Sequence, residues 1–151
     1  MNRKKLQNDI QDILEKPGDL DSKLEKVCKY LKENVEYYDW VGFYFVDPRK
    51  KDELVLGPFA GEPTIHVRIK FGEGICGQAA ITRKVFIVPD VSKESNYLAC
   101  SPEVKSEIVI PIFKGDELVG ELDIDSHTQD AFTEEDRYLL ENIARMIGDI
   151  M

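Results

Sequence analysis

The stretch that decides the fold is residues 108–126, IVIPIFKGDELVGELDIDS. Apolar and β-branched residues dominate Ile108–Phe113 and Leu118–Ile124, and the polar segment Lys114–Asp116 lies between them. β-Branched residues favour strands, and a short glycine-containing segment between two strand-like runs favours a hairpin turn. The pattern therefore predicts an antiparallel hairpin.

Four shorter segments upstream of this hairpin also have the composition of strands. They are rich in aromatic and β-branched residues, which are typical of strands. These segments are Trp40–Val46, Glu53–Leu56, Ile65–Ile69 and Val85–Val88. With the hairpin they predict a sheet of about six strands. A glycine-rich turn that enters a small-residue helix (residues 72–80) and an irregular polar stretch (residues 89–105) interrupt the series.

Apolar residues recur at helical spacing near both ends of the chain. They predict a helix over residues 6–14 and, after the break at residues 17–19, a second helix capped by Asp21 or Ser22. Thr133 and Asp136 resemble a capping box at the start of a last helix. Strands grouped between helices predict an α+β fold with an antiparallel sheet. The chain has the length of one domain, so we expect a single domain over residues 1–151.

Composition and charge exclude several classes of partner. The formal net charge is −9, and no basic stretch is long enough to neutralise a series of phosphates, so no nucleic-acid partner is expected. No apolar run approaches the roughly 18 residues of a transmembrane helix, and the N-terminus lacks the apolar core of a signal peptide. We therefore expect a cytoplasmic protein with no membrane partner.

The chain has three cysteines, and this odd number argues against a disulfide framework in a reducing compartment. Cys28 belongs to the apolar stripe of the second predicted helix and is expected to be a core residue. Cys76 lies near a predicted helix N-terminus, where backbone N–H groups and the helix dipole favour a thiolate with a lowered pKa. Its alternative role is that of a small residue needed for tight packing.

Cys100 lies in the irregular polar stretch, within Asn96–Pro102. A long irregular loop in a compact domain is more often functional than accidental. The local sequence leaves two alternatives open: a reactive thiol, or an inert and half-buried one.

Three acids alternate with apolar residues in the second strand of the hairpin. On a strand, Glu121, Asp123 and Asp125 share one face, and Glu107 at the start of the first strand can join them. If this face is exposed, the pattern means only an amphipathic strand. If it lines a pocket, the carboxylates raise one another's pKa values and attract a cation such as an α-ammonium group.

A zinc site is conceivable from four residues, Cys76, Cys100, His66 and His127. No two of them have the short spacing of a structural zinc site. We therefore expect no metal and no other cofactor.

Taken together, several motifs resemble the free methionine-(R)-sulfoxide reductases, which are stand-alone enzymes of the GAF fold. The resemblance runs in order from about residue 40 to the last helix, with family-like spacing. It rests on six stretches: WVGFY at 40–44, LVLGPF at 54–59, GICG at 74–77, AC at 99–100, SEIV at 106–109 and LDIDS at 122–126.

The resemblance implies a GAF fold and a thiol-based mechanism. Cys100 falls on the catalytic cysteine of the family, which attacks the sulfoxide sulfur of free methionine-(R)-sulfoxide and becomes a sulfenic acid. A second thiol then forms a disulfide, which thioredoxin or another thiol reductant reopens. The resemblance also points to a homodimer. It places the substrate among the acidic residues Glu107, Asp123 and Asp125 and the aromatic residues Trp40 and Tyr44.

One departure from the family concerns regeneration of the thiol. The family commonly has a resolving cysteine ten residues before the position of Cys76, and this chain has His66 there. Three outcomes are open: Cys76 resolves Cys100 directly, an external thiol does so, or turnover is lost and only binding is kept. Because Cys100 and all the acids remain, we expect retained activity. His66 as an imidazolium near Cys100 would lower the pKa of that thiol, and the alternative is a strand residue that faces water.

Two other functions compete with reduction of a sulfoxide. One is a non-catalytic GAF sensor that binds a small molecule, and the other is a thiol peroxidase-like activity.

Overall fold

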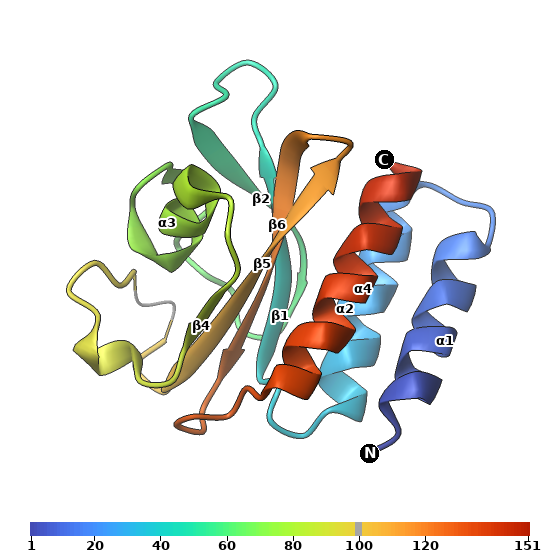
Figure 1. Cartoon of the computed structure of the whole chain (residues 1–151), viewed down its shortest axis with the longest axis horizontal. Coiled ribbons are helices and arrows are strands. Elements are labelled where there is room, and N and C mark those ends of the chain that lie inside the picture. The colour runs from blue at the N-terminus through green and yellow to red at the C-terminus, as the bar shows by residue number, and fades with distance from the viewer. Residues whose placement is uncertain (99–100) are drawn as a thin grey trace.

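The computed structural model describes residues 1–98 and 101–151, which form a six-stranded sheet with helices on both faces (Figure 1). The elements in chain order are α1 (Arg3–Glu15), α2 (Leu20–Asn34), β1 (Trp40–Val46), β2 (Glu53–Ala60), β3 (Arg68–Lys70), α3 (Gly74–Thr82), β4 (Phe86–Val88), the short 3-10 turn η1 (Val91–Lys93), β5 (Ser106–Lys114), β6 (Glu117–Ser126) and α4 (Glu134–Ile150).

The predicted hairpin is confirmed, and neither of its strands is at the edge of the sheet, because β6 pairs with β1 and β5 pairs with β4. β5 and β6 pair antiparallel from Ser106↔Ser126 to Lys114↔Glu117. Gly115 in the turn has φ of 61°, a left-handed conformation that glycine adopts without strain. The strand order is β3-β2-β1-β6-β5-β4, and every pairing is antiparallel. The fold is therefore α+β, as the sequence predicts.

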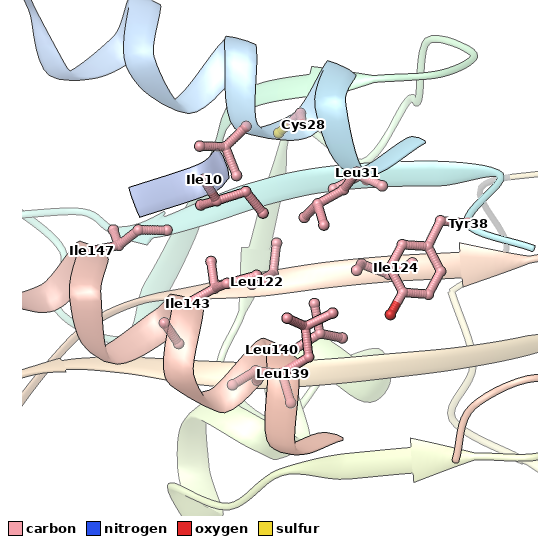
Figure 2. Close-up of a cluster of buried hydrophobic side chains, with 14 of the residues drawn as sticks. Ile10, Cys28, Leu31, Tyr38, Leu122, Ile124, Leu139, Leu140, Ile143 and Ile147 are labelled. Carbon is pink, nitrogen blue, oxygen red and sulfur yellow. The ribbon is translucent and has the colours of Figure 1, made fainter. Parts of the chain in front are cut away.

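Three helices, α1, α2 and α4, cover one face of the sheet, and α3 lies on the opposite side (Figure 1). Under the three helices, the apolar residues of β6 pack against α1, α2 and α4, as Figure 2 shows for Leu122 and Ile124. Cys28 lies within this core and is fully buried, so its predicted core role is confirmed. Burial raises the pKa of its thiol, which suits a packing residue rather than a nucleophile.

One of the two predicted helix caps is confirmed and the other is wrong. The capping box of Thr133 and Asp136 at the start of α4 is confirmed. The predicted cap of α2 at Asp21 or Ser22 is wrong, because α2 begins at Leu20 and Asp19 caps it by accepting from the backbone N–H of Ser22. Among the described residues, no helix is both long and apolar enough to cross a membrane.

Most strand boundaries lie within about two residues of the prediction, and two differ by more. The strand expected over Ile65–Ile69 is wrong over its first part, since β3 contains only Arg68–Lys70. Local turns replace the strand there: the N–H of Val67 bonds to the carbonyl of Ile65, and the N–H of His66 bonds to Thr64 Oγ1. β2, in contrast, is longer than expected and continues through Gly57 and Pro58 to Ala60.

Candidate active site

The acidic face of β6 points away from the three-helix layer and is buried. Three acids on this face, Glu121, Asp123 and Asp125, are at most 2% exposed. The face is therefore not the exposed side of an amphipathic strand but the buried, pocket-lining side that the sequence also allowed. The alternation places the carboxyl groups on the α3 side, while Leu122 and Ile124 face the helical core.

Strand register brings the predicted aromatic and acidic residues onto this same face. In an antiparallel pair, residues directly opposite one another share a face. Trp40 and Tyr44 of β1 lie opposite Asp125 and Glu121 of β6. Glu107 of β5 lies opposite Asp125 from the other side and is itself buried. The sheet thus gathers the five predicted substrate-binding residues, with Glu121 in addition.

Cys76 lies against this face from α3. Its Sγ, a carboxylate oxygen of Glu107 and one of Asp123 all lie within 4.8 Å of one another. The three residues line a cavity of about 10 Å³, which is room for roughly one water molecule. Tyr44, His66 and Leu98 also line this cavity.

Burial controls the ionisation of the acidic face. It raises the pKa of Glu121 well above the usual value, and the neighbouring charge of Asp123 raises it further. Burial likewise raises the pKa of Asp125 and of Asp123. Carboxyl groups in such a place hold their protons to higher pH than exposed ones do. The face can therefore supply protons as well as negative charge.

The predicted lowering of the Cys76 pKa is wrong. Cys76 does lie in the first turn of α3, but burial raises the pKa of its thiol well above the usual value, and the charges of Asp123, Glu121, Glu107 and Asp125 add to the rise. Desolvation and four nearby acids outweigh the favourable helix terminus. Cys76 is thus a neutral thiol in this state.

Ring and backbone contacts hold the aromatic residues of the site in place. The indole of Trp40 stacks on Phe59 with ring centroids 5.6 Å apart, and its Nε1 donates to the carbonyl of Glu62 at 2.9 Å. Tyr44 donates its phenolic hydrogen to the carbonyl of His66 at 2.8 Å. Beside Trp40 is a second small cavity of about 40 Å³, which Asp125 and His127 also line.

Cys100 lies outside the described residues, so its predicted role and its distance from His66 and Cys76 stay predictions. The described residues on either side of it border the site. Leu98 lines the cavity at Cys76, and Ser101 lines the cavity at Trp40 and Asp125.

Two residues belong to the site that the predicted set of binding residues does not contain. Glu121 carries the same alternation signal as Asp123 and is equally buried. His66 is half-buried and lines the cavity at Cys76, so it is not the strand residue facing water that the sequence also allowed. His66 reaches this cavity from the turn before β3, and the sequence did not predict that turn.

Comparison with known proteins identifies the family. The sequence model of the GAF domain family matches residues 18–151 of this chain. The free methionine-R-sulfoxide reductase of Saccharomyces cerevisiae is 42% identical over 111 residues, which are 73% of this chain and 61% of the yeast protein. The protein of the same name from Escherichia coli is 34% identical over 128 residues, 85% of this chain and 75% of that protein.

A solved structure agrees with these relatives. The X-ray structure of the free methionine-R-sulfoxide reductase from Neisseria meningitidis, in complex with its substrate, matches with a TM-score of 0.90 and 36% identity. The match covers 97% of this chain and 86% of that one. The fold, the sequence model and the relatives agree: this chain belongs to the GAF domain family and, within it, to the free methionine-R-sulfoxide reductases, which are oxidoreductases.

Proposed function

We propose that this chain reduces free methionine-(R)-sulfoxide to methionine, with Cys100 as the nucleophile. The observation that carries the proposal is the buried acidic face that lies beside Trp40 and the Cys76 thiol. The relatives named for this activity and the substrate complex of the Neisseria enzyme support the substrate.

The acidic face suits the chemistry of a sulfoxide. Sulfur becomes a good centre for attack when the sulfoxide oxygen accepts a proton, and a carboxyl group with a raised pKa supplies it. A neighbouring ionised carboxylate holds the α-ammonium group of the amino acid. The indole of Trp40, which is 5% exposed, gives the apolar part of the substrate a surface to pack on.

The proposed first step is a net transfer of oxygen from substrate to enzyme. The Cys100 thiolate attacks the sulfur of the protonated sulfoxide and forms a sulfur–sulfur bond, and the sulfoxide oxygen leaves as water. A water molecule then attacks the Cys100 sulfur and breaks this bond, which releases methionine and leaves Cys100 as a sulfenic acid. Methionine has gained the two electrons that the Cys100 sulfur has lost. The two cavities of the site, about 10 Å³ and 40 Å³, are too small for an amino acid, so the site widens when substrate enters.

In the proposed second step Cys76 is the resolving thiol. Its sulfur condenses with the sulfenic acid of Cys100, which releases water and forms a disulfide. Thioredoxin or another thiol reductant then returns both residues to thiols. Cys76 supports this role because it is a free thiol on the site face and lines the same cavity as Leu98, which precedes Cys100 by two residues.

The remaining properties of the protein are also proposals. We infer a single domain over residues 1–151 that acts in the cytoplasm as a homodimer. Support for the dimer comes from the family resemblance and from the exposed ring of Tyr138 on α4. Light scattering of the purified chain at micromolar concentration measures the oligomeric state.

An epimer-resolved assay tests the function. Purified protein with a small dithiol, and separately with thioredoxin, is given each epimer of free methionine sulfoxide. We expect methionine from the R epimer only, and none from Cys100→Ser. No turnover of the R epimer with either reductant overturns the proposal, and ligand binding without turnover favours the sensor instead.

A further inference from the structure

We propose that Cys76, Glu107 and Asp123 form a binding site for a divalent cation of the zinc class, and that the bound cation keeps the substrate out. The binding itself does not depend on the proposed reductase activity. Only the inhibition rests on it.

The first support is the convergence of three donor atoms. Cys76 Sγ and one oxygen each from Glu107 and Asp123 lie within 4.8 Å of one another, and all three residues are buried. A tetrahedral zinc ion, with bonds of about 2.0–2.3 Å, needs ligand atoms about 3.3–3.7 Å apart. The three donors can reach this spacing by small side-chain adjustments, without movement of the sheet or of α3.

The second support is Asp123 itself, a carboxyl group that lines the same cavity. It is 2% exposed, and its Oδ1 has no hydrogen-bond partner among the described residues. Since buried polar atoms are almost always paired, an unpaired carboxyl oxygen beside the cavity indicates a missing partner. A cation bound between Asp123, Glu107 and Cys76 is such a partner.

The size and charge of the cavity suit a metal ion. Its volume before the site widens for substrate is about 10 Å³, which accepts one water molecule or one dehydrated cation. Glu121 and Asp125 add two further buried carboxyl groups on the same face of β6. Two positive charges at the centre of this cluster offset the repulsion that ionised carboxylates otherwise feel.

The donor set selects the kind of cation. One thiolate with carboxylates suits borderline or soft ions such as Zn²⁺, Co²⁺ and Cd²⁺, whereas Mg²⁺ and Ca²⁺ prefer all-oxygen sites. Binding requires Cys76 to become a thiolate, so its proton passes to solvent and affinity rises with pH. The three ligands come from α3, β5 and β6 and have no short spacing in the sequence, so a sequence motif does not reveal the site.

Cobalt titration tests the site directly, because a Co²⁺–thiolate bond gives a charge-transfer band in the near ultraviolet. Reduced protein is titrated with CoCl₂, and the bound cobalt is then displaced with ZnCl₂. We expect one Co²⁺ per chain with the thiolate band, and loss of the band in Cys76→Ser. Cys100→Ser and Cys28→Ala are matched controls that should keep it, since each removes a different thiol.

The outcomes separate this proposal from the proposed function. A band that survives in Cys76→Ser or disappears in Cys100→Ser overturns the site, as does a folded wild-type chain that binds no stoichiometric Co²⁺. If Cys76→Ser does not fold by circular dichroism, Asp123→Asn decides, with an expected loss of affinity of at least about tenfold. Stoichiometric binding by a chain that reduces no sulfoxide leaves the metal site standing and removes only the reductase proposal.

Discussion

The indole ring of Trp40 lies across Gly42, two residues further along β1. A Cβ added at Gly42 would come within 2.3 Å of Cη2 of that ring. Gly42 is also directly opposite Asp123 of β6, so the missing side chain lets the indole lie over the middle of the acidic face. A glycine inside a strand weakens the strand, and here the close approach of Trp40 accounts for it.

Replacement of Gly42 by alanine should displace the indole. Trp40 is 5% exposed, and it is the only tryptophan in the chain, so its emission reports on this position alone. We expect a red shift of the fluorescence in Gly42→Ala and, if the proposed function holds, a rise in KM of about tenfold or more through loss of a positioned surface. Unchanged emission from a folded variant would contradict the packing described for Trp40. For KM, a Trp40→Phe/Gly42→Ala double variant is compared with Trp40→Phe alone, since the smaller ring relieves part of the clash with the alanine.

Glu121 should make stability depend on pH. Its pKa is higher in the folded chain than in the unfolded one, so the folded state binds more protons and loses stability as pH rises above the ordinary pKa of glutamate. Glu121→Gln removes this loss, because an amide does not ionise. We therefore expect the free energy of unfolding of the variant, relative to that of the wild type, to rise by about 1–3 kcal/mol between pH 5 and pH 8.5. Urea unfolding at the two pH values measures it. Glu117→Gln, an exposed change on the same strand, should show no such gain.

Asp136 should tie the start of α4 to the segment before β1. It accepts hydrogen bonds from the phenols of Tyr37 and Tyr38, each at 2.7 Å, and it is fully buried. Tyr38→Phe leaves this carboxyl group short of one donor, with an expected loss of about 1.5–3 kcal/mol in the free energy of unfolding. Chemical denaturation checks the value. An equal loss in Tyr138→Phe, whose ring is exposed, would argue against the buried network as the cause.

The same network predicts a loss of stability in alkali. Burial and the Asp136 carboxylate raise the pKa of Tyr37 to about 12, from an unfolded value of about 10. The folded state keeps the proton longer, so this contribution to stability is fully present below about pH 10 and is lost as pH rises through 12. The free energy of unfolding, measured from pH 9 to pH 11.5, should therefore fall more steeply with pH for the wild type than for Tyr37→Phe. Parallel curves would contradict the raised pKa.

Cys76→Ser should separate oxygen transfer from regeneration. If Cys76 resolves Cys100, the variant releases about one methionine per chain in a first burst and then slows at least about tenfold with thioredoxin as reductant. Since the pKa of the Cys76 thiol is raised, the regeneration step in the wild type should speed up as pH rises. Undiminished turnover of Cys76→Ser with thioredoxin would instead assign resolution to an external thiol. Cys28→Ala is the control, because its thiol lies in the core under the helices.

Local patterns predicted much of this fold. The hairpin of β5 and β6 and the capping box at Thr133 follow from residues that are close in sequence, so short-range rules suffice. The turn at Ile65–Val67 did not follow, because its apolar residues suggest a strand while local hydrogen bonds and pairing in the sheet decide otherwise.

The candidate site was predictable in composition but not in its electrostatics. Alternation alone shows that Glu121, Asp123 and Asp125 share a face, and only the placement of α3 over the sheet shows that this face is buried. The pKa of Cys76 was mispredicted for the same reason. A helix terminus can be read from neighbouring residues, whereas the four acids that oppose the thiolate come from strands distant in sequence.

The alternation along β6 has a consequence for how this chain can change over evolutionary time. A slip of one residue in the pairing of β6 would turn its three acids into the helical core and its leucine and isoleucine into the site. Burial of these carboxyl groups in the apolar core under the three helices would cost far more free energy than any new contacts made by the slip would gain. The residues that give the site its chemistry therefore also fix the register of β6. Insertions and deletions in this hairpin should be confined to its exposed turn, where they leave the register of the two strands unchanged.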